Sequence, residues 1–280
     1  MPNISEKAVL VTLKISQFTK TKEDKSVSKE VEEAHKAKND AGKYQKLLLS
    51  KEVTKEIQKI AGRARTFHYE RTLPWGDEGT RLLPAKWYMD YISEMKKLEH
   101  EFNMKVFELD YQGAIEEAKQ RLGDMFNENE YPDQKEFQEE YSFNYKVYPV
   151  PDKNDFRVNL SKEDIEIMKV ELEENLQKTQ VGVNKAVWRK LYDVVKKMSD
   201  TLGDEDKQFH KSLVDNIKSL CEILPELNIL EDPLLETLKM EVVEKLTITS
   251  PEVLRDDIEK RNDVAKNAED LAKRMSAYAF

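Results

Sequence analysis

The chain has 280 residues, of which 36% are charged and 39% hydrophobic, so it holds enough apolar material for one large core or two modest ones. Its net charge of −9 argues against nonspecific coating of duplex nucleic acid, because such coating needs many cations to neutralise phosphates. The single cysteine, Cys221, excludes a disulfide framework within the chain. No apolar run is long enough to span a bilayer and the first residues lack a signal-peptide pattern, so we expect a soluble cytoplasmic protein with no membrane partner.

Charge is distributed unevenly along the chain. Residues 1–71 carry 16 Lys and Arg against 10 Asp and Glu, whereas the remainder carries 30 against 45. Such asymmetry marks either a basic binding end or two halves that attract each other, and both interpretations stay open.

The first predicted element is a strand over residues 8–16. Four branched apolar residues alternate there with Leu10, Thr12, Lys14 and Ser16, a period of two that indicates a half-buried strand: Val9, Val11, Leu13 and Ile15. A polar loop is expected over 20–29, then a lysine-rich helix near 31–49. Ser50 is placed to cap a helix over about 51–65.

The segment 62–88, GRARTFHYERTLPWGDEGTRLLPAKWY, is the most distinctive part of the chain. It contains four of the ten arginines and five of the 24 aromatic residues. Pro74, Gly76 and Gly79 predict a turn, and we expect the segment to end the preceding helix. From Trp87 onward, apolar residues recur at helical spacing as far as Leu109. This pattern predicts one long helix that continues to about residue 122 with a kink at Gly113.

The second half begins with a predicted hairpin over 142–160. Its strands, 142–150 and 156–160, would pair with the N-terminal strand. Helices then follow over about 162–203, with a bend at Gly182, and over 207–224, 233–246 and 251 to the C-terminus. The first of them carries an apolar face of Ile165, Met168, Leu172 and Leu176 behind a cap at Ser161.

These elements predict a mostly α fold of the α+β class, with long helices packed on a small antiparallel sheet from the N-terminal strand and the central hairpin. We expect an α+β domain over 1–160 and a helical region over 161–280. The last helix has many charges and a thin apolar stripe, so it is expected to act in association more than in the core. The alternative is packing against the seam of Leu213, Ile217 and Leu220.

No catalytic signature is present. The chain has no phosphate loop, no dinucleotide fingerprint, no nucleophile elbow and no cysteine–histidine pair. Four histidines lack a second ligand at metal-binding spacing: His35, His68, His100 and His210. We therefore expect no enzyme, no metal and no cofactor. A metal-dependent nuclease built from acids far apart in the sequence remains the alternative.

Segment 62–88 is the candidate binding site, for a protein partner or for single-stranded nucleic acid. Guanidinium groups can hold phosphates while aromatic faces stack on unpaired bases. The candidate residues are Arg63, Arg65, Phe67, His68, Tyr69, Arg71, Trp75 and Arg81. The alternative is a structural junction, in which the rings form a core and the arginines pair with Glu70, Asp77 and Glu78.

Four stretches, VLVTLKISQFT, AGRARTFHYERTLPW, RLLPA and FRVNL, carry a family resemblance. Over about the first 160 residues the chain resembles an uncharacterised protein family of tailed phages and integrative mobile elements. Members often lie beside a MoxR-like AAA ATPase and a von Willebrand A-type protein, which implies a partner complex. The family has no established catalytic residues. We therefore expect a non-enzymatic phage or mobile-element interaction protein in a multi-protein assembly, with single-stranded nucleic-acid binding or annealing as the alternative.

Overall fold

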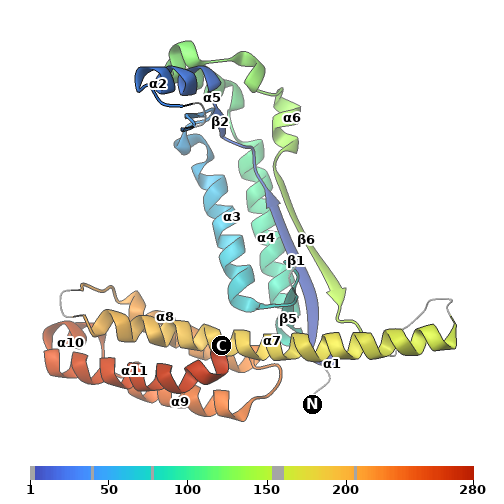
Figure 1. Ribbon diagram of the computed structural model, residues 1–280, viewed down its shortest axis with the longest axis vertical. Coiled ribbons are helices and arrows are strands. Elements are labelled where there is room, and N and C mark those ends of the chain that lie inside the picture. Colours follow the sequence, from blue (N-terminus) through green and yellow to red (C-terminus); the bar gives the residue numbers. More distant parts are fainter. Residues whose placement is uncertain (1–3, 39–40, 77–78, 153–160, 205–206) are drawn as a thin grey trace. The chain divides into compact units, whose positions relative to one another are not determined.

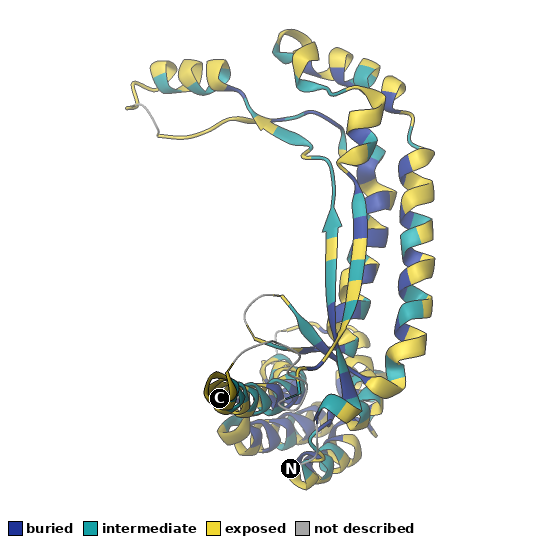
Figure 2. Cartoon of the chain, turned by 90° about the vertical axis from the view of Figure 1, so that its right-hand side faces the viewer, coloured by how far each residue is buried: buried dark blue, intermediate teal, exposed yellow. Residues whose placement is uncertain are grey.

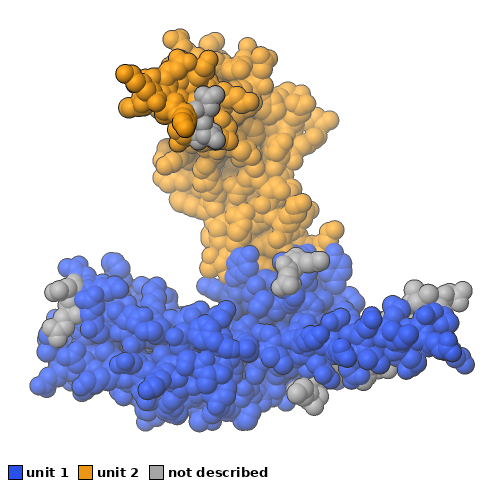
Figure 3. Space-filling model, viewed as in Figure 1, with its two compact units in different colours: residues 1–12, 69–89, 147–280 blue, residues 13–68, 90–146 orange. Residues whose placement is uncertain are grey.

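The computed structural model describes residues 4–38, 41–76, 79–152, 161–204 and 207–280, and its helices and strands form two compact units (Figures 1 and 3). Unit 1 comprises residues 1–12, 69–89 and 147–280, and unit 2 comprises residues 13–68 and 90–146. The predicted α+β class, mostly helical with a small antiparallel sheet, is confirmed. The units do not coincide with the expected division into 1–160 and 161–280. Whether residues 1–160 fold on their own stays a prediction.

The elements follow one another in an order that mixes short strands with long helices. They are α1 (Ile4–Lys7), β1 (Ala8–Ser16), β2 (Thr21–Glu23), α2 (Lys25–Ala34), β3 (Gln45–Leu47), α3 (Lys51–Arg71), β4 (Leu73–Pro74), β5 (Arg81–Pro84), η1 (Ala85–Trp87), α4 (Tyr88–Phe107), α5 (Tyr111–Leu122), η2 (Gly123–Met125), η3 (Glu128–Glu130), α6 (Gln134–Glu139), β6 (Ser142–Pro149), α7 (Lys162–Leu202), α8 (Ser212–Leu227), α9 (Pro233–Leu246), α10 (Pro251–Asp256) and α11 (Ile258–Ala279).

The main sheet has the strand order β4-β5-β1-β6, so the predicted pairing of β1 with the strand over 142–150 is confirmed. β1 and β5 are antiparallel, with Val11 opposite Arg81. The expected strict alternation of β1 is wrong around Leu10 and Val11, because both are buried. Leu10 belongs to the core cluster of unit 1, so β1 is covered on both faces there. The second predicted hairpin strand, 156–160, lies outside the described residues.

The predictions for residues 20–49 are wrong. Where a loop and then a helix were expected, β2 and β3 form an antiparallel pair on either side of α2. Asp24 starts α2 early, because its carboxylate accepts hydrogen bonds from the backbone N–H groups of Ser26 and Val27. α2 has no buried residue, so its position in the sequence is set by this cap and not by an apolar stripe.

α3 continues through Gly62 and ends at Arg71, so it ends within segment 62–88 and before Pro74 as expected, but beyond the predicted end near residue 65. A glycine inside a helix costs only about 1 kcal/mol relative to alanine. Burial of the helix face outweighs that cost, through Ile57, Ile60, Ala61, Ala64 and His68. Candidate residues 63–71 are therefore presented from a helix.

The predicted helix over 87–122 is two helices. α4 ends at Phe107, and Asp110 caps α5 by accepting a hydrogen bond from the N–H of Gly113 at 2.9 Å. The apolar stripe predicted for the first of them is confirmed by its buried residues, with exposed residues between them (Figure 2): Tyr91, Met95, Leu98, Phe102 and Val106. Trp87 lies in η1 and Leu109 lies between the two helices.

The C-terminal helices form most of the core of unit 1. α7 begins at the predicted Ser161 cap and passes Gly182 without a break. α8 includes Pro225, which was expected to lie beyond its end. α11 is not an exposed arm, because it packs against α7 and α9 through a buried face of Val264, Ala265, Ala268, Leu271, Ala272, Met275 and Ala279. Four of those residues are alanines. The apolar face is therefore wider than the thin stripe that the large apolar residues of the sequence predicted.

Candidate functional site

The eight candidate residues do not fall in one compact unit. Arg63, Arg65, Phe67 and His68 belong to unit 2, whereas Tyr69, Arg71, Trp75 and Arg81 belong to unit 1.

The four candidates in unit 2 mostly hold the unit together. Buried His68 joins its Nδ1 to the hydroxyl of Tyr91 at 2.7 Å, and Phe67 stacks on the same ring with centroids 5.8 Å apart. Arg63 pairs with Glu101 at 2.8 Å, and Arg65 donates to the carbonyl of Ile15 at 3.3 Å. These contacts support the structural interpretation for Phe67 and His68. Arg63 pairs with an acid from α4 and not with the acids expected from the sequence, of which Asp77 and Glu78 lie outside the described residues.

The four candidates in unit 1 include one exposed arginine–aromatic pair. The guanidinium of Arg81 lies 4.7 Å from the ring centroid of Tyr69, whose side chain is 54% exposed. Arg81 also donates to the hydroxyl of Thr72 at 2.6 Å and to its carbonyl at 2.9 Å, which fixes the guanidinium plane. Arg71 lies 4.8 Å from the ring of Trp87. Trp75 packs against the core of the unit, so it anchors the turn.

Arg81 borders a pocket of about 500 Å³ in unit 1, between the β4–β5 turn, α7 and the end of α11. Four cationic side chains line this basic pocket: Arg81, Lys185, Arg189 and Lys190. Its remaining walls are Pro74, Gly182, Ala186, Asp193, Ala279 and Phe280. Only one of these residues is acidic, so the pocket has a surplus of positive charge in an acidic protein.

The cations lie on the polar side of α7 because the opposite side is buried. Val187, Trp188 and Leu191 are in the core, and the indole N–H of Trp188 donates to Asp232 at 3.0 Å. This anchor fixes the rotation of α7. Lys185 and Arg189, one helical turn apart, then reach the pocket on the same face.

Contacts with neighbouring groups orient the cations within the pocket. Lys185 donates to the main-chain oxygen of Phe280, and the guanidinium of Arg189 lies 4.7 Å from the Phe280 ring centroid. Lys190 donates to the carbonyl of Tyr69 at 2.7 Å. Burial, reinforced by the positive charge of Arg81 and opposed by Glu70, lowers the pKa of Lys190 to about 8. Its ammonium charge is therefore retained at neutral pH and lost in mildly alkaline solution.

Sequence reasoning found Arg81 and Tyr69 but missed Lys185, Arg189 and Lys190. The only local signal for the missed residues is a Lys and an Arg four positions apart followed directly by a second Lys. On a charged helix that spacing usually marks a solvated face. More than 100 residues separate Arg81 from these cations, and only the fold brings them together.

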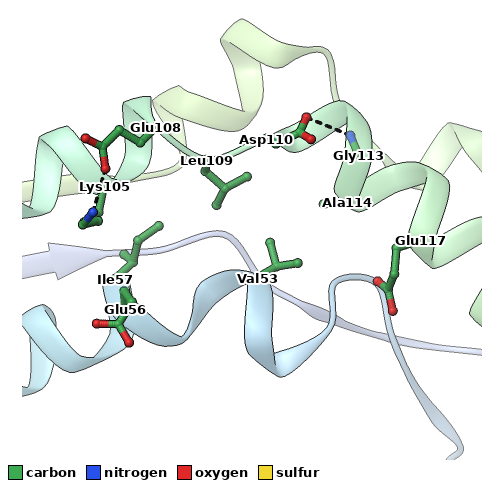
Figure 4. A pocket seen from close by; sticks show the side chains of 10 residues that line it. All are labelled: Val53, Glu56, Ile57, Lys105, Glu108, Leu109, Asp110, Gly113, Ala114 and Glu117. Carbon is green, nitrogen blue, oxygen red and sulfur yellow. Dashed lines mark hydrogen bonds and ion pairs between the residues drawn. The ribbon is translucent and has the colours of Figure 1, made fainter.

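A cavity of about 410 Å³ lies in unit 2 between α3 and the α4–α5 junction (Figure 4). Its polar groups serve the local structure: Lys105 pairs with Glu108 at 2.7 Å, and Asp110 caps α5. Several carboxylates border the cavity, yet among the described residues no group of three or more His, Cys, Asp or Glu is placed to hold a metal ion.

A buried ion cluster supports the β2–β3 end of unit 2. The ammonium of Lys46 lies 3.2 Å from Asp24 and 2.9 Å from Glu130, and it donates to the carbonyl of Met125 at 2.7 Å. Hydrogen bonds from Ser26, Val27 and Lys46 lower the pKa of Asp24 to about 2. Every hydrogen of the ammonium has a neighbouring oxygen, so this cluster is structural.

Comparison with family models, with curated proteins and with solved structures found no match. Within the described ranges, no helix is both long enough and apolar enough to cross a membrane.

Proposed function

We propose that this is a non-enzymatic interaction protein that works in a multi-protein assembly. The proposal is based on an apolar stripe in the N-terminal half of α7 that no other described element buries. Residues 162–182 contain no buried residue, although an apolar stripe runs along them at spacings of three and four: Ile165, Met168, Leu172 and Leu176. The stripe leads directly into Val183, the first buried residue of the helix.

The apolar side chains of such a stripe are removed from water only when a second helix packs against them. The flanks of the stripe are acidic, because residues 162–181 carry six Asp and Glu against three Lys. A second copy of the chain would bring the same negative charge. We therefore propose a partner helix from another protein, with basic residues beside its own apolar stripe.

The family resemblance over about residues 1–160 supplies candidates for that partner. We propose that the protein belongs to a phage or mobile element, acts in the cytoplasm of the host, and binds the AAA ATPase or the von Willebrand A-type protein encoded beside it. These assignments rest on the resemblance alone.

The test is co-expression with those two neighbours and measurement of the complex mass by light scattering. Leu172→Glu places a charge in the stripe and is expected to abolish the complex while leaving the thermal unfolding curve unchanged. Val170→Glu is the matched control, because Val170 is exposed on another face of the same helix. A complex that resists Leu172→Glu, or no complex at all, contradicts the proposal. A dimer of the protein alone that Leu172→Glu dissolves assigns the stripe to self-association.

The second candidate function is single-stranded nucleic-acid binding or annealing through segment 62–88. One observation favours it: Arg81 and exposed Tyr69 stand together beside the basic pocket. Binding of a fluorescent single strand that weakens steeply with salt, and weakens again in Arg81→Gln, would support this function. Phe67 and His68 are packed inside unit 2, so they contribute to its structure and not to this surface.

A further inference from the structure

We propose that the basic pocket of unit 1 binds the phosphate of a nucleotide, either free or within a single strand. This inference does not depend on the partner helix, because the pocket and the stripe of α7 use different residues. It extends the second candidate function, because it places most of the binding residues on α7 and not in segment 62–88.

The pocket has a surplus of positive charge. Four cations line it together with Asp193, and the main-chain oxygen of Phe280 accepts a hydrogen bond from Lys185. Glu70 and Asp193 are the acidic side chains nearby. Lys185 and Arg189 are exposed while Arg81 and Lys190 are half-buried, and cations gathered in this way attract an anion. A bound phosphate would supply that anion.

Neighbouring groups hold three of the four cations in place. Arg81 is fixed by Thr72, Arg189 lies over Phe280, and Lys190 is tethered to the Tyr69 carbonyl, so three of the cations are pre-oriented. Guanidinium forks bind phosphate oxygens in pairs, and an ammonium adds a compact point charge. A volume of about 500 Å³ is in the range of small-molecule sites and admits a phosphate together with its sugar.

The aromatic rings beside the cations favour a nucleotide over an acidic peptide as the ligand. Two rings stand at the cations, and both remain largely accessible: Tyr69 is 54% and Phe280 is 59% exposed. The Arg81 guanidinium lies over Tyr69 and the Arg189 guanidinium over Phe280, which also contacts Tyr192, and the exposed parts of both rings are where a base can stack. Carboxylates of an acidic peptide would satisfy the cations and leave the rings unused.

The test uses the full chain and a fluorescein-labelled oligothymidylate, with thymidine monophosphate and polyglutamate as competitors. The double variant Lys185→Gln/Arg189→Gln removes two cations from the pocket. Lys178→Gln/Lys197→Gln removes two exposed lysines from the same helix and serves as the matched control. Thermal unfolding of each variant checks that the fold is retained.

We expect the pocket variant to weaken oligonucleotide binding at least about tenfold and to reduce the salt slope by about 0.7, because one phosphate contact is lost. The control should bind as the wild type does. Competition by the monophosphate assigns the site to a free nucleotide, and binding of the strand without such competition assigns it to single-stranded nucleic acid. No binding at low salt, equal losses in both variants, or tighter binding of polyglutamate overturns the proposal.

Discussion

The two halves of α7 have the same apolar periodicity and opposite environments. In residues 183–202 the periodic positions are buried against α8, α9 and α11, and Trp188 at the centre is fully buried. In residues 162–182 none is buried. Periodicity therefore shows that a helix has an apolar face, but it does not show which molecule covers that face. The covered half belongs to the core, and the uncovered half is the part for which we propose a partner.

The largest effect is expected from Trp188→Ala in the covered half. The substitution leaves a cavity beneath Tyr278, which stacks on the indole with centroids 4.8 Å apart, and it removes the hydrogen bond to Asp232. We expect the free energy of unfolding to fall by about 3–5 kcal/mol in urea titrations. Leu176→Ala in the uncovered half should change it by less than about 0.5 kcal/mol. Similar losses of unfolding free energy in Trp188→Ala and Leu176→Ala would contradict the difference between the two halves.

A smaller effect is expected at the end of the covered half. Buried Arg261 of α11 donates to the carbonyls of Thr201, Leu202, Asp204 and Lys207, and so satisfies the last turn of α7. Arg261→Met should lower the free energy of unfolding by about 1–3 kcal/mol, because these carbonyls lose a charged donor. Lys260→Met breaks only a surface pair with Asp257 and is the control. An Arg261 variant as stable as this control would contradict the capping role.

Gly182, where the two halves meet, offers a stabilising change. A Cβ added there meets no atom within 4 Å, so Gly182→Ala should raise stability by about 0.5–1 kcal/mol through helix propensity. Hydrogen exchange should slow in residues 162–182. Gly203→Ala gives the opposite sign, because its Cβ would lie 3.0 Å from the carbonyl of Ser199. A destabilised Gly182→Ala variant would mean that the helix is not continuous at this point.

A pH dependence is also expected in the covered half. The pKa of Lys190 is lowered to about 8, whereas in the unfolded chain it has its usual value of 10.5. Between these values the unfolded state binds more protons, so the contribution of Lys190 to stability rises with pH. We expect the wild type to gain stability relative to Lys190→Met from pH 8 towards pH 10. A constant or shrinking difference would show that the charge is not disfavoured by folding.

Local pattern predicted the parts of the fold that depend on neighbours in the sequence. The alternation of residues 8–16 predicted β1, and the stripe from Tyr91 to Val106 predicted α4. The predictions were wrong where individual side chains, and not the spacing of large apolar residues, decided the structure. Asp24 and Asp110 each cap the start of a helix at a position where no helix start was expected, and the alanines of α11 form an apolar face that larger residues did not reveal.

The candidate site could be predicted only in part, for a similar reason. Tyr69 and Arg81 were recognised because arginines and rings alternate within one segment. The sequence did not reveal Lys185, Arg189 and Lys190. They line a pocket only together with residues near β4, β5 and the end of α11, which are distant in sequence. Phe67 and His68 resemble their neighbours in composition, but α3 turns them toward Tyr91.

The interleaving of the two units has a consequence for synthesis on the ribosome. Every residue of unit 2 has been translated once residue 146 is made, whereas unit 1 needs residues 147–280 to join its early segments 1–12 and 69–89. Leu10 and Leu82 are made long before Trp188 and Leu271, with which they share a core cluster. The apolar residues of those early segments therefore stay exposed until the last helices emerge. We expect a chaperone to bind the segments of unit 1 during this time and to prevent their aggregation.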